Sequence, residues 1–117
     1  MQVIIVEDEL MLALALEEFL TQQCYSVCGI AYRRDEAMKL AVESKCDLAI
    51  LDCNLRGESV EPVAGLLMER GIPIVFVTGY GTGAVPEQFK GYPVVAKPYA
   101  DAVLLQAIEL ALGRALA

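Results

Sequence analysis

Residues 48–54 read Leu-Ala-Ile-Leu-Asp-Cys-Asn, and this stretch determines the fold that the rest of the chain must follow. Leu48–Leu51 presents no polar face, so we predict a strand covered on both sides. Such strands are typical of parallel sheets packed between two layers of helices. The apolar run ends at Asp52, a carboxylate placed where the strand leaves the core. The stretch therefore predicts the central strand of an α/β sheet with a functional group at its end.

Outward from this strand, short β-branched runs alternate with longer helical patterns, which indicates parallel βαβ units. We predict further strands at Val3–Val6, Val27–Ala31, Ile74–Val77 and Val94–Ala96, and helices from Leu10 to about Gln23, Arg34 to about Ser44, Val60 to about Arg70 and Asp101 to about Leu116. Right-handed crossovers favour a flavodoxin-like, doubly wound five-stranded parallel sheet of order 2-1-3-4-5. The 117 residues fit one domain, residues 1–117. Asp101 is a plausible N-cap for the last helix.

The helical pattern fails between the fourth and fifth strands. This segment contains Gly79, Gly81, Gly83, Pro86, Gly91 and Pro93. In a helix interior each glycine costs about 1 kcal/mol relative to alanine, and each proline about 3 kcal/mol. We therefore predict a loop with at most a short helical turn near Pro86–Phe89, so that the fourth helix is weakened or missing.

Composition excludes several classes of function. The net charge of −7 argues against nucleic-acid binding, which requires clustered basic residues. No apolar run is long enough to span a membrane, and the first residues lack the cationic start of a signal peptide. The four cysteines, Cys24, Cys28, Cys46 and Cys53, form no CxxC pair, and the chain has no histidine, which disfavours a zinc site. We predict a cytoplasmic protein with reduced thiols.

Polar side chains follow four of the five predicted strands. Glu7 and Asp8 follow the first, Asp52 the third, Thr78 the fourth and Lys97 the fifth. The carboxyl ends of parallel strands meet at one edge of the sheet, so these side chains should lie together. Two carboxylates about 4 Å apart repel by roughly 4 kcal/mol at an effective dielectric near 20. The cluster therefore needs a cation, and hard oxygen ligands suit Mg²⁺ or Mn²⁺.

These groups match what in-line phosphoryl transfer requires. Asp52 supplies a carboxylate nucleophile, Thr78 a hydroxyl donor and Lys97 a fixed positive charge. Asn54 is placed to lend a backbone carbonyl to the metal. Each residue also has an ordinary structural interpretation: Asp8 could cap the first helix, and Asp52 could form an Asx-turn. Their coincidence at four strand ends favours the functional interpretation.

The ordered motifs resemble the receiver domain of two-component response regulators over essentially the whole chain. The motifs are Val-Ile-Ile-Val-Glu7-Asp8-Glu9, Leu-Ala-Ile-Leu-Asp52-Cys-Asn54-Leu, Val-Phe76-Val-Thr78-Gly79-Tyr80 and Val-Val-Ala-Lys97-Pro98-Tyr99. The resemblance implies that Asp52 accepts a phosphoryl group from the phosphohistidine of a sensor histidine kinase or phosphotransfer protein. It also implies that Asp8, Asp52 and the Asn54 carbonyl bind Mg²⁺, with Glu7 acting through water. Thr78 and Lys97 would contact the phosphoryl oxygens, and the Lys97–Pro98 bond would be cis.

The segment from Phe76 to Tyr80 resembles more narrowly an alphaproteobacterial, often single-domain, subgroup with a Phe-Ala-Thr-Gly-Tyr type signature. Val77 replaces the alanine. Many receivers carry an aromatic residue three positions before the lysine, where this chain has Val94, and Tyr92 lies two residues earlier. We therefore predict that Thr78 and Tyr80 act instead by ordering the loop from residue 79 to residue 91.

The last helix carries more apolar residues than one buried face needs. Val103, Leu104, Ala107, Ile108, Ala111 and Leu112 form the predicted sheet-facing stripe, with Leu105 and Leu116 partly outside it. The surplus is consistent with a surface for a homodimer, a kinase or a downstream protein target.

Three other classes of function fit the sequence less well. A haloacid-dehalogenase-like phosphatase needs an acid two residues after its nucleophile, where this chain has Asn54. A flavodoxin-like FMN binder needs a phosphate loop after the first strand, where this chain has Glu7, Asp8 and Glu9. A pseudo-receiver acting as an unphosphorylated scaffold is disfavoured by the complete set of site residues. A domain that catalyses only its own phosphorylation and dephosphorylation is not counted as an enzyme.

Overall fold

Five parallel strands form the single central sheet of the computed structural model, which describes residues 1–79 and 85–113. The strands are β1 (Gln2–Val6), β2 (Ser26–Ala31), β3 (Leu48–Asp52), β6 (Ile74–Thr78) and β7 (Val94–Ala96). Their spatial order is β2-β1-β3-β6-β7, which confirms the predicted order because β6 and β7 are the fourth and fifth strands of this sheet. All five residues of β3 are buried in the middle of the sheet, as the apolar run predicted.

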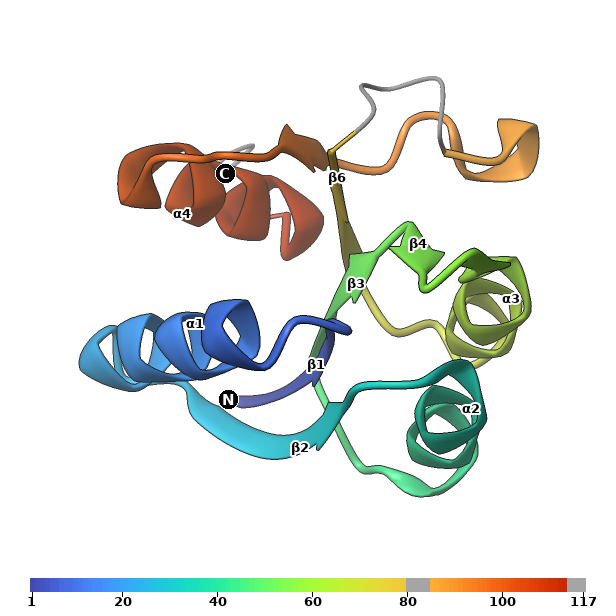
Figure 1. The fold of residues 1–117 in the computed structure, drawn as a ribbon. Helices are drawn as coiled ribbons and strands as arrows, with labels where there is room; N and C mark the ends of the chain where they lie inside the picture. The colour runs from blue at the N-terminus through green and yellow to red at the C-terminus, as the bar shows by residue number, and fades with distance from the viewer. Residues whose placement is uncertain (80–84, 114–117) are drawn as a thin grey trace.

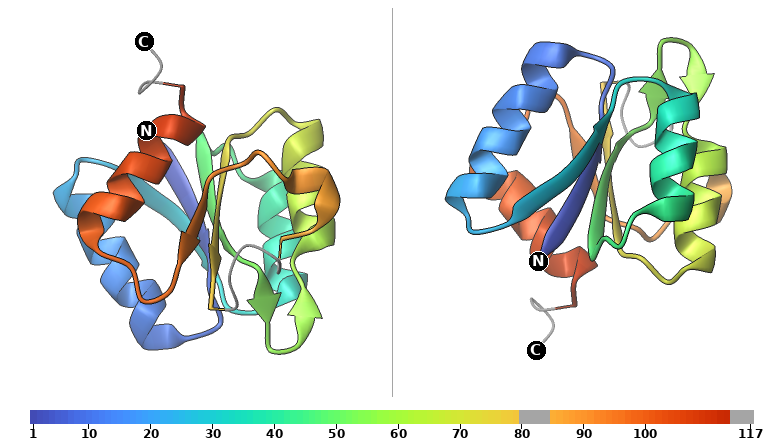
Figure 2. Two further views of the ribbon diagram at one scale, coloured as in Figure 1. Left: turned by 90° about the horizontal axis from the view of Figure 1, so that it is seen from above. Right: turned by 90° about the horizontal axis from the view of Figure 1, so that it is seen from below.

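Helices cover both faces of the sheet. Helices α1 (Leu10–Gln22) and α4 (Asp101–Ala111) lie on one face, and α2 (Arg34–Glu43) and α3 (Glu61–Glu69) lie on the other (Figure 1). The two views along the sheet in Figure 2 show the same three layers from above and below. Because successive side chains of a strand point to opposite faces of the sheet, they pack into two separate apolar cores, one on each face.

The segment between β6 and β7 contains no α-helix among its described residues, as predicted. Residues Glu87–Phe89 form one short 3-10 turn. Phe89 is fully buried, and its ring lies 5.6 Å from that of Phe76 and 6.0 Å from that of Tyr92. This aromatic contact holds the turn on the α2–α3 face of the sheet. Gly81 and Gly83 lie outside the described residues, so the absence of a helix at these two positions stays a prediction.

The last helix differs from the prediction in three respects. Its N-cap is Ala100 rather than Asp101. Asp101 is instead the first helical residue, where its negative charge interacts favourably with the helix dipole. The helix ends at Ala111, before the predicted end at Leu116, which lies outside the described residues. Val103 is 50% exposed, because it lies about 100° around the helix from the buried Leu104 and falls beside the sheet-facing stripe.

No helix within the described part of the chain, residues 1–79 and 85–113, is long and apolar enough to cross a membrane. All four cysteines are free thiols. Cys24 and Cys28 are exposed, whereas Cys46 and Cys53 are buried.

Candidate functional site at the carboxyl edge of the sheet

Three carboxylates converge where β1 and β3 end. Glu7, Asp8 and Asp52 each offer an oxygen atom, and these atoms all lie within 4.8 Å of one another. Glu7 and Asp52 are each only 6% exposed, and Asp8 is half-buried. The strands deliver them together because β1 pairs with β3 in parallel, Val6 facing Leu51, so that the next residues of both strands leave the sheet side by side.

Among the described residues, Lys97 is the one lysine whose ammonium group contacts these carboxylates. Its Nζ donates to Glu7 Oε1 and to Asp52 Oδ2, at 2.8 Å each. Burial alone would lower the pKa of Lys97, but the hydrogen bonds and charges of Asp52 and Glu7 outweigh burial and raise it. The ammonium therefore stays charged at neutral pH.

Glu7 is the carboxylate that burial affects most. Burial raises its pKa to about 7, and the negative charge of Asp52 acts in the same direction. The hydrogen bond from Lys97 and the backbone N–H of Glu9 oppose this shift. Three carboxylates face a single ammonium, so the site has room for another positive charge when all three are ionised.

Thr78 is the last residue of β6 and is almost fully buried. Its neighbour across the sheet is Ala96, and the backbone N–H of Lys97 donates to the Thr78 carbonyl at 2.8 Å. The Lys97–Pro98 peptide bond is cis, as the resemblance implied. The structure thus brings Thr78 and Lys97 to the same edge as the carboxylates.

A short hairpin that the sequence analysis missed borders the site. Strands β4 (Asn54–Leu55) and β5 (Glu58–Ser59) pair antiparallel around a two-residue turn, Arg56–Gly57. Both turn residues have positive φ, 53° and 87°, as a two-residue hairpin turn of type I′ requires. Gly57 was the available signal, but arginine at the preceding position is unusual because a side chain disfavours that conformation.

The hairpin orders two of the carboxylates through backbone N–H groups. The N–H of Arg56 donates to Asp8 Oδ2 at 3.0 Å, and the N–H of Asn54 donates to Asp52 Oδ1 at 3.1 Å. The Asn54 side chain accepts from the N–H of Gly57 at 2.7 Å, which closes the turn. Leu55, fully buried, fixes the hairpin to the core.

An open cavity of about 450 Å³ lies over these groups. It is lined by Asp8, Glu9, Asp52, Asn54, Arg56, Gly57, Gly79 and Lys97. The carboxylates are hard oxygen ligands of the kind that Mg²⁺ and Mn²⁺ prefer, and the cavity leaves room for water and an incoming group. The donor set therefore fits a divalent cation next to Asp52.

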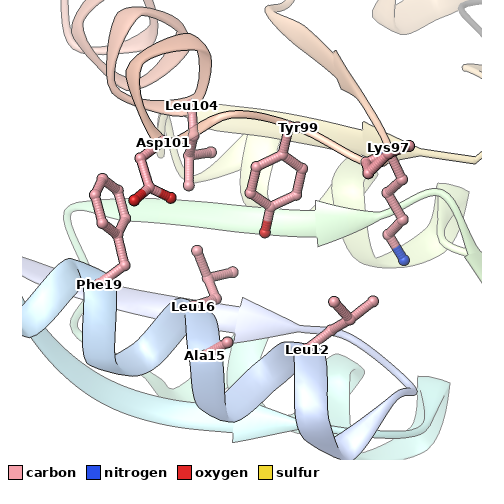
Figure 3. A pocket seen from close by; sticks show the side chains of 9 residues that line it. Leu12, Ala15, Leu16, Phe19, Lys97, Tyr99, Asp101 and Leu104 are labelled. Carbon is pink, nitrogen blue, oxygen red and sulfur yellow. The ribbon is translucent and has the colours of Figure 1, made fainter.

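A second, more apolar groove lies beside the site, between α1 and the start of α4 (Figure 3). Its volume is about 470 Å³, and it is lined by Leu12, Ala15, Leu16, Phe19, Lys97, Pro98, Tyr99, Asp101 and Leu104. Figure 3 shows the side chains of α1 facing those of Tyr99 and Leu104 across the groove. The sequence analysis found more apolar residues on the last helix than one buried face needs, but it did not predict this groove.

Tyr92 does not approach the site. Its ring packs edge-on against Phe76, 6.0 Å between centroids, on the α2–α3 face. Val94, three positions before Lys97, pairs with Phe76 in the sheet. Tyr80 lies outside the described residues, so the predicted ordering of the loop from residue 79 to residue 91 stays a prediction.

The family model of the response regulator receiver domain matches residues 3–109. The chain therefore belongs to the receiver-domain family, a family of regulators rather than classical enzymes, and the fold and the clustered carboxylates agree with that assignment.

Individual relatives support the same family. The solution structure of SdrG from Sphingomonas melonis Fr1 is 38% identical, with a TM-score of 0.83, over 95% of this chain and 94% of that one. The phyllosphere-induced regulator PhyR of Methylorubrum extorquens is 34% identical over 95% of this chain and 43% of its own length. The transcriptional regulatory protein PdtaR of Mycobacterium tuberculosis is 32% identical over 97% of this chain and 57% of its own. The chain spans about half the length of these two curated relatives, and the likeness to SdrG and PhyR confirms the narrower subgroup resemblance.

Proposed function

We propose that this chain is the phosphoacceptor of a two-component phosphorelay, in which Asp52 receives a phosphoryl group from a phosphohistidine. The observation that carries the proposal is the position of Asp52: it is buried, 2.8 Å from an ammonium and within 4.8 Å of two further carboxylates, below an open cavity. A structural carboxylate would need the ion pair but not the acidic neighbours, which destabilise it unless a cation binds.

The residues divide the chemistry between them. A carboxylate oxygen of Asp52 attacks phosphorus as the phosphorus–nitrogen bond of the donor breaks, and the imidazole leaves with the electron pair. Glu7, Asp8, Asp52 and Asn54 would hold Mg²⁺ or Mn²⁺, which would neutralise charge on the phosphoryl oxygens. Lys97 already contacts Asp52 and would transfer its hydrogen bond to a phosphoryl oxygen, while the Thr78 hydroxyl would donate to another.

The donor is a protein, in this proposal a sensor histidine kinase or a phosphotransfer protein. The apolar groove between α1 and α4 adjoins Lys97, and the exposed Leu10, Met11 and Leu14 continue the apolar surface along α1. A helical partner seated there would hold its phosphohistidine next to the open cavity over Asp52. The last helix adds Val103, which the sequence analysis expected to face the sheet but which is half exposed, to the apolar surface available to a docking partner.

The test uses a small phosphodonor, acetyl phosphate, with Mg²⁺, and intact-mass spectrometry. The wild-type chain should gain one phosphoryl group, and Asp52→Asn should gain none. Asp47→Asn is the matched control, because Asp47 directly precedes the opposite end of β3 and its side chain accepts a hydrogen bond from the backbone N–H of Gln2. Equal labelling of wild type and Asp52→Asn would refute the assignment.

The scaffold alternative makes a different prediction in the same experiment. An unphosphorylated pseudo-receiver would stay unlabelled in the wild type with acetyl phosphate and with a phosphorylated phosphotransfer protein. Chelation adds a second test of the phosphoacceptor function. Labelling of Asp52 should disappear when EDTA removes the divalent cation, because the uncompensated negative charge of the three carboxylates then repels the phosphodonor.

A further inference from the structure

Arg56 occupies a position of the β4–β5 hairpin where the backbone favours glycine. Its φ of 53° is a left-handed conformation, which is strained for any residue that carries a side chain. Strained backbone of this kind is concentrated at functional sites. Arg56 also lines the cavity over Asp52, so the contribution expected of its side chain concerns that cavity.

The guanidinium group of Arg56 is the uncommitted one among the four arginines that the structure describes. Arg33 and Arg34 form ion pairs with acidic neighbours at 3.4 and 3.1 Å, and Arg70 donates to two backbone carbonyls at 2.7 Å each. Arg56 is exposed, and no ion pair or hydrogen bond within the described part of the chain engages its side chain. This guanidinium group is therefore available to a ligand.

The backbone of Arg56 is fixed next to the carboxylates. Its N–H donates to Asp8 Oδ2 at 3.0 Å, and an oxygen of Asp8 lies within 4.8 Å of an oxygen of Asp52. Arg56 also lines a neighbouring cavity of about 440 Å³, together with Arg33 and Arg34. Its side chain thus starts on the rim that the two cavities share, and a side chain of this length and flexibility can extend over Asp52.

The cavity over Asp52 offers little positive charge to an incoming anion. Asp8, Glu9 and Asp52 line it with negative charge, and the ammonium group of Lys97 is already engaged by two carboxylates at 2.8 Å each. A phosphodonor carries negative charge on its phosphoryl oxygens, so the carboxylates repel it. A planar guanidinium group can bind two such oxygens at once, which suits Arg56 to offset this repulsion.

We propose that Arg56 binds the phosphoryl group of the incoming phosphodonor and guides it to Asp52. This inference rests on the proposed phosphoacceptor function and adds a donor-binding residue to it. The contribution of Arg56 is to binding and orientation, and the bonds that form and break remain those at Asp52.

The test measures the second-order rate constant for labelling by acetyl phosphate with Mg²⁺, followed by intact-mass spectrometry. Arg56→Met and Arg56→Lys both keep the backbone N–H that donates to Asp8. Arg56→Met should be labelled about tenfold more slowly than wild type, the effect of losing one charge-assisted hydrogen bond, and Arg56→Lys should recover part of that loss. Added salt should slow the wild type more than Arg56→Met, because salt screens the attraction between the guanidinium group and the anionic donor.

Lys90→Met is the matched control. It removes one positive charge from the chain, as Arg56→Met does, but Lys90 pairs with Glu87 at an exposed position and lines a cavity with Pro73 and Ile74, where β6 begins. Lys90→Met should be labelled at the wild-type rate. Equal rates for wild type and Arg56→Met, or an equal loss in Lys90→Met and Arg56→Met, would overturn the inference.

A second measurement separates this inference from the phosphoacceptor function. Acetylphosphonate, in which a P–C bond replaces the P–O bond that breaks during transfer, is titrated into the wild type with Mg²⁺ while NMR follows the Nε–H resonance of Arg56. The resonance is assigned by its loss in Arg56→Lys, and it should shift as acetylphosphonate is added. A shift in a wild type that acetyl phosphate does not label would defeat the phosphoacceptor function but leave Arg56 as a phosphoryl-binding residue. A resonance that does not move would defeat the role of Arg56, whatever the labelling shows.

Discussion

Replacing Lys97 by methionine should destabilise the metal-free protein by about 3–5 kcal/mol, the range for removing one partner of a buried ion pair. Methionine keeps most of the aliphatic length of lysine but removes its ammonium group. Glu7 and Asp52 side chains, only 7% and 8% exposed, then face each other without the group that now contacts both. Their oxygen atoms lie within 4.8 Å of one another, and at that upper limit two ionised carboxylates repel by about 3.5 kcal/mol at an effective dielectric near 20, which agrees with that range.

Urea denaturation of wild type and Lys97→Met, in EDTA, measures this loss directly. Lys90→Met is the matched control, because Lys90 makes an ion pair of similar length with Glu87, 2.7 Å, at an exposed position. That variant should lose at most about 1 kcal/mol. Equal losses for the two variants would contradict the conclusion that burial gives the Lys97 contacts their energy.

The loss at Lys97 should also depend on pH. Glu7 already has a pKa of about 7 in the folded protein, and removing Lys97 raises it further. At lower pH the variant binds a proton at Glu7 and the repulsion disappears, so the difference from wild type should shrink as pH falls toward 7 and then level off, because Glu7 is protonated in both proteins below that pH. In the wild type, the same raised pKa means that Glu7 favours folding least at high pH: its contribution falls between the unfolded value near 4.5 and about 7. A loss that grows as pH falls would refute this account.

Two further variants test how the surroundings of the site are built. Arg56→Gly should raise the free energy of unfolding by about 0.5–1 kcal/mol in urea denaturation, because Arg56 has a φ of 53° that glycine adopts without strain; a decrease would show that its side chain makes compensating contacts. Phe89→Ala should lower the free energy of unfolding by about 3–5 kcal/mol, because Phe89 is fully buried against Phe76 and Tyr92; a loss below about 1 kcal/mol would mean that the turn is not held by this contact.

The sequence predicted the sheet and the grouping of the site residues because both follow from burial. A run such as Leu48–Leu51 with no polar face can only lie inside a covered sheet, and parallel strands bring their carboxyl ends to one edge. Glu7, Asp52 and Lys97 therefore had to meet once the strand order was right.

Features set by local backbone geometry were not predictable in the same way. The hairpin depends on a left-handed conformation at Arg56, which few non-glycine residues adopt, so the sequence favours an ordinary loop there. Asp101 was expected at the N-cap, but the helix begins one residue earlier in the chain, at a boundary that propensity does not resolve. The groove between α1 and α4 depends on how two helices from distant parts of the chain pack, which no local pattern encodes.

The order of the strands explains why the cation of this site is a lysine. Lys97 leaves β7, and Asp52 leaves β3, with β6 between them. Two inter-strand spacings amount to about 10 Å, a distance that a long flexible side chain can cross and a histidine cannot. The ammonium contacts Asp52 Oδ2, while Asp52 Oδ1 accepts a hydrogen bond from the backbone N–H of Asn54, and Lys97 lines the same open cavity as Asp8 and Asn54. A single lysine thus holds two of the carboxylates together in the metal-free protein, at the edge of the cavity where a divalent cation and a phosphoryl group would bind.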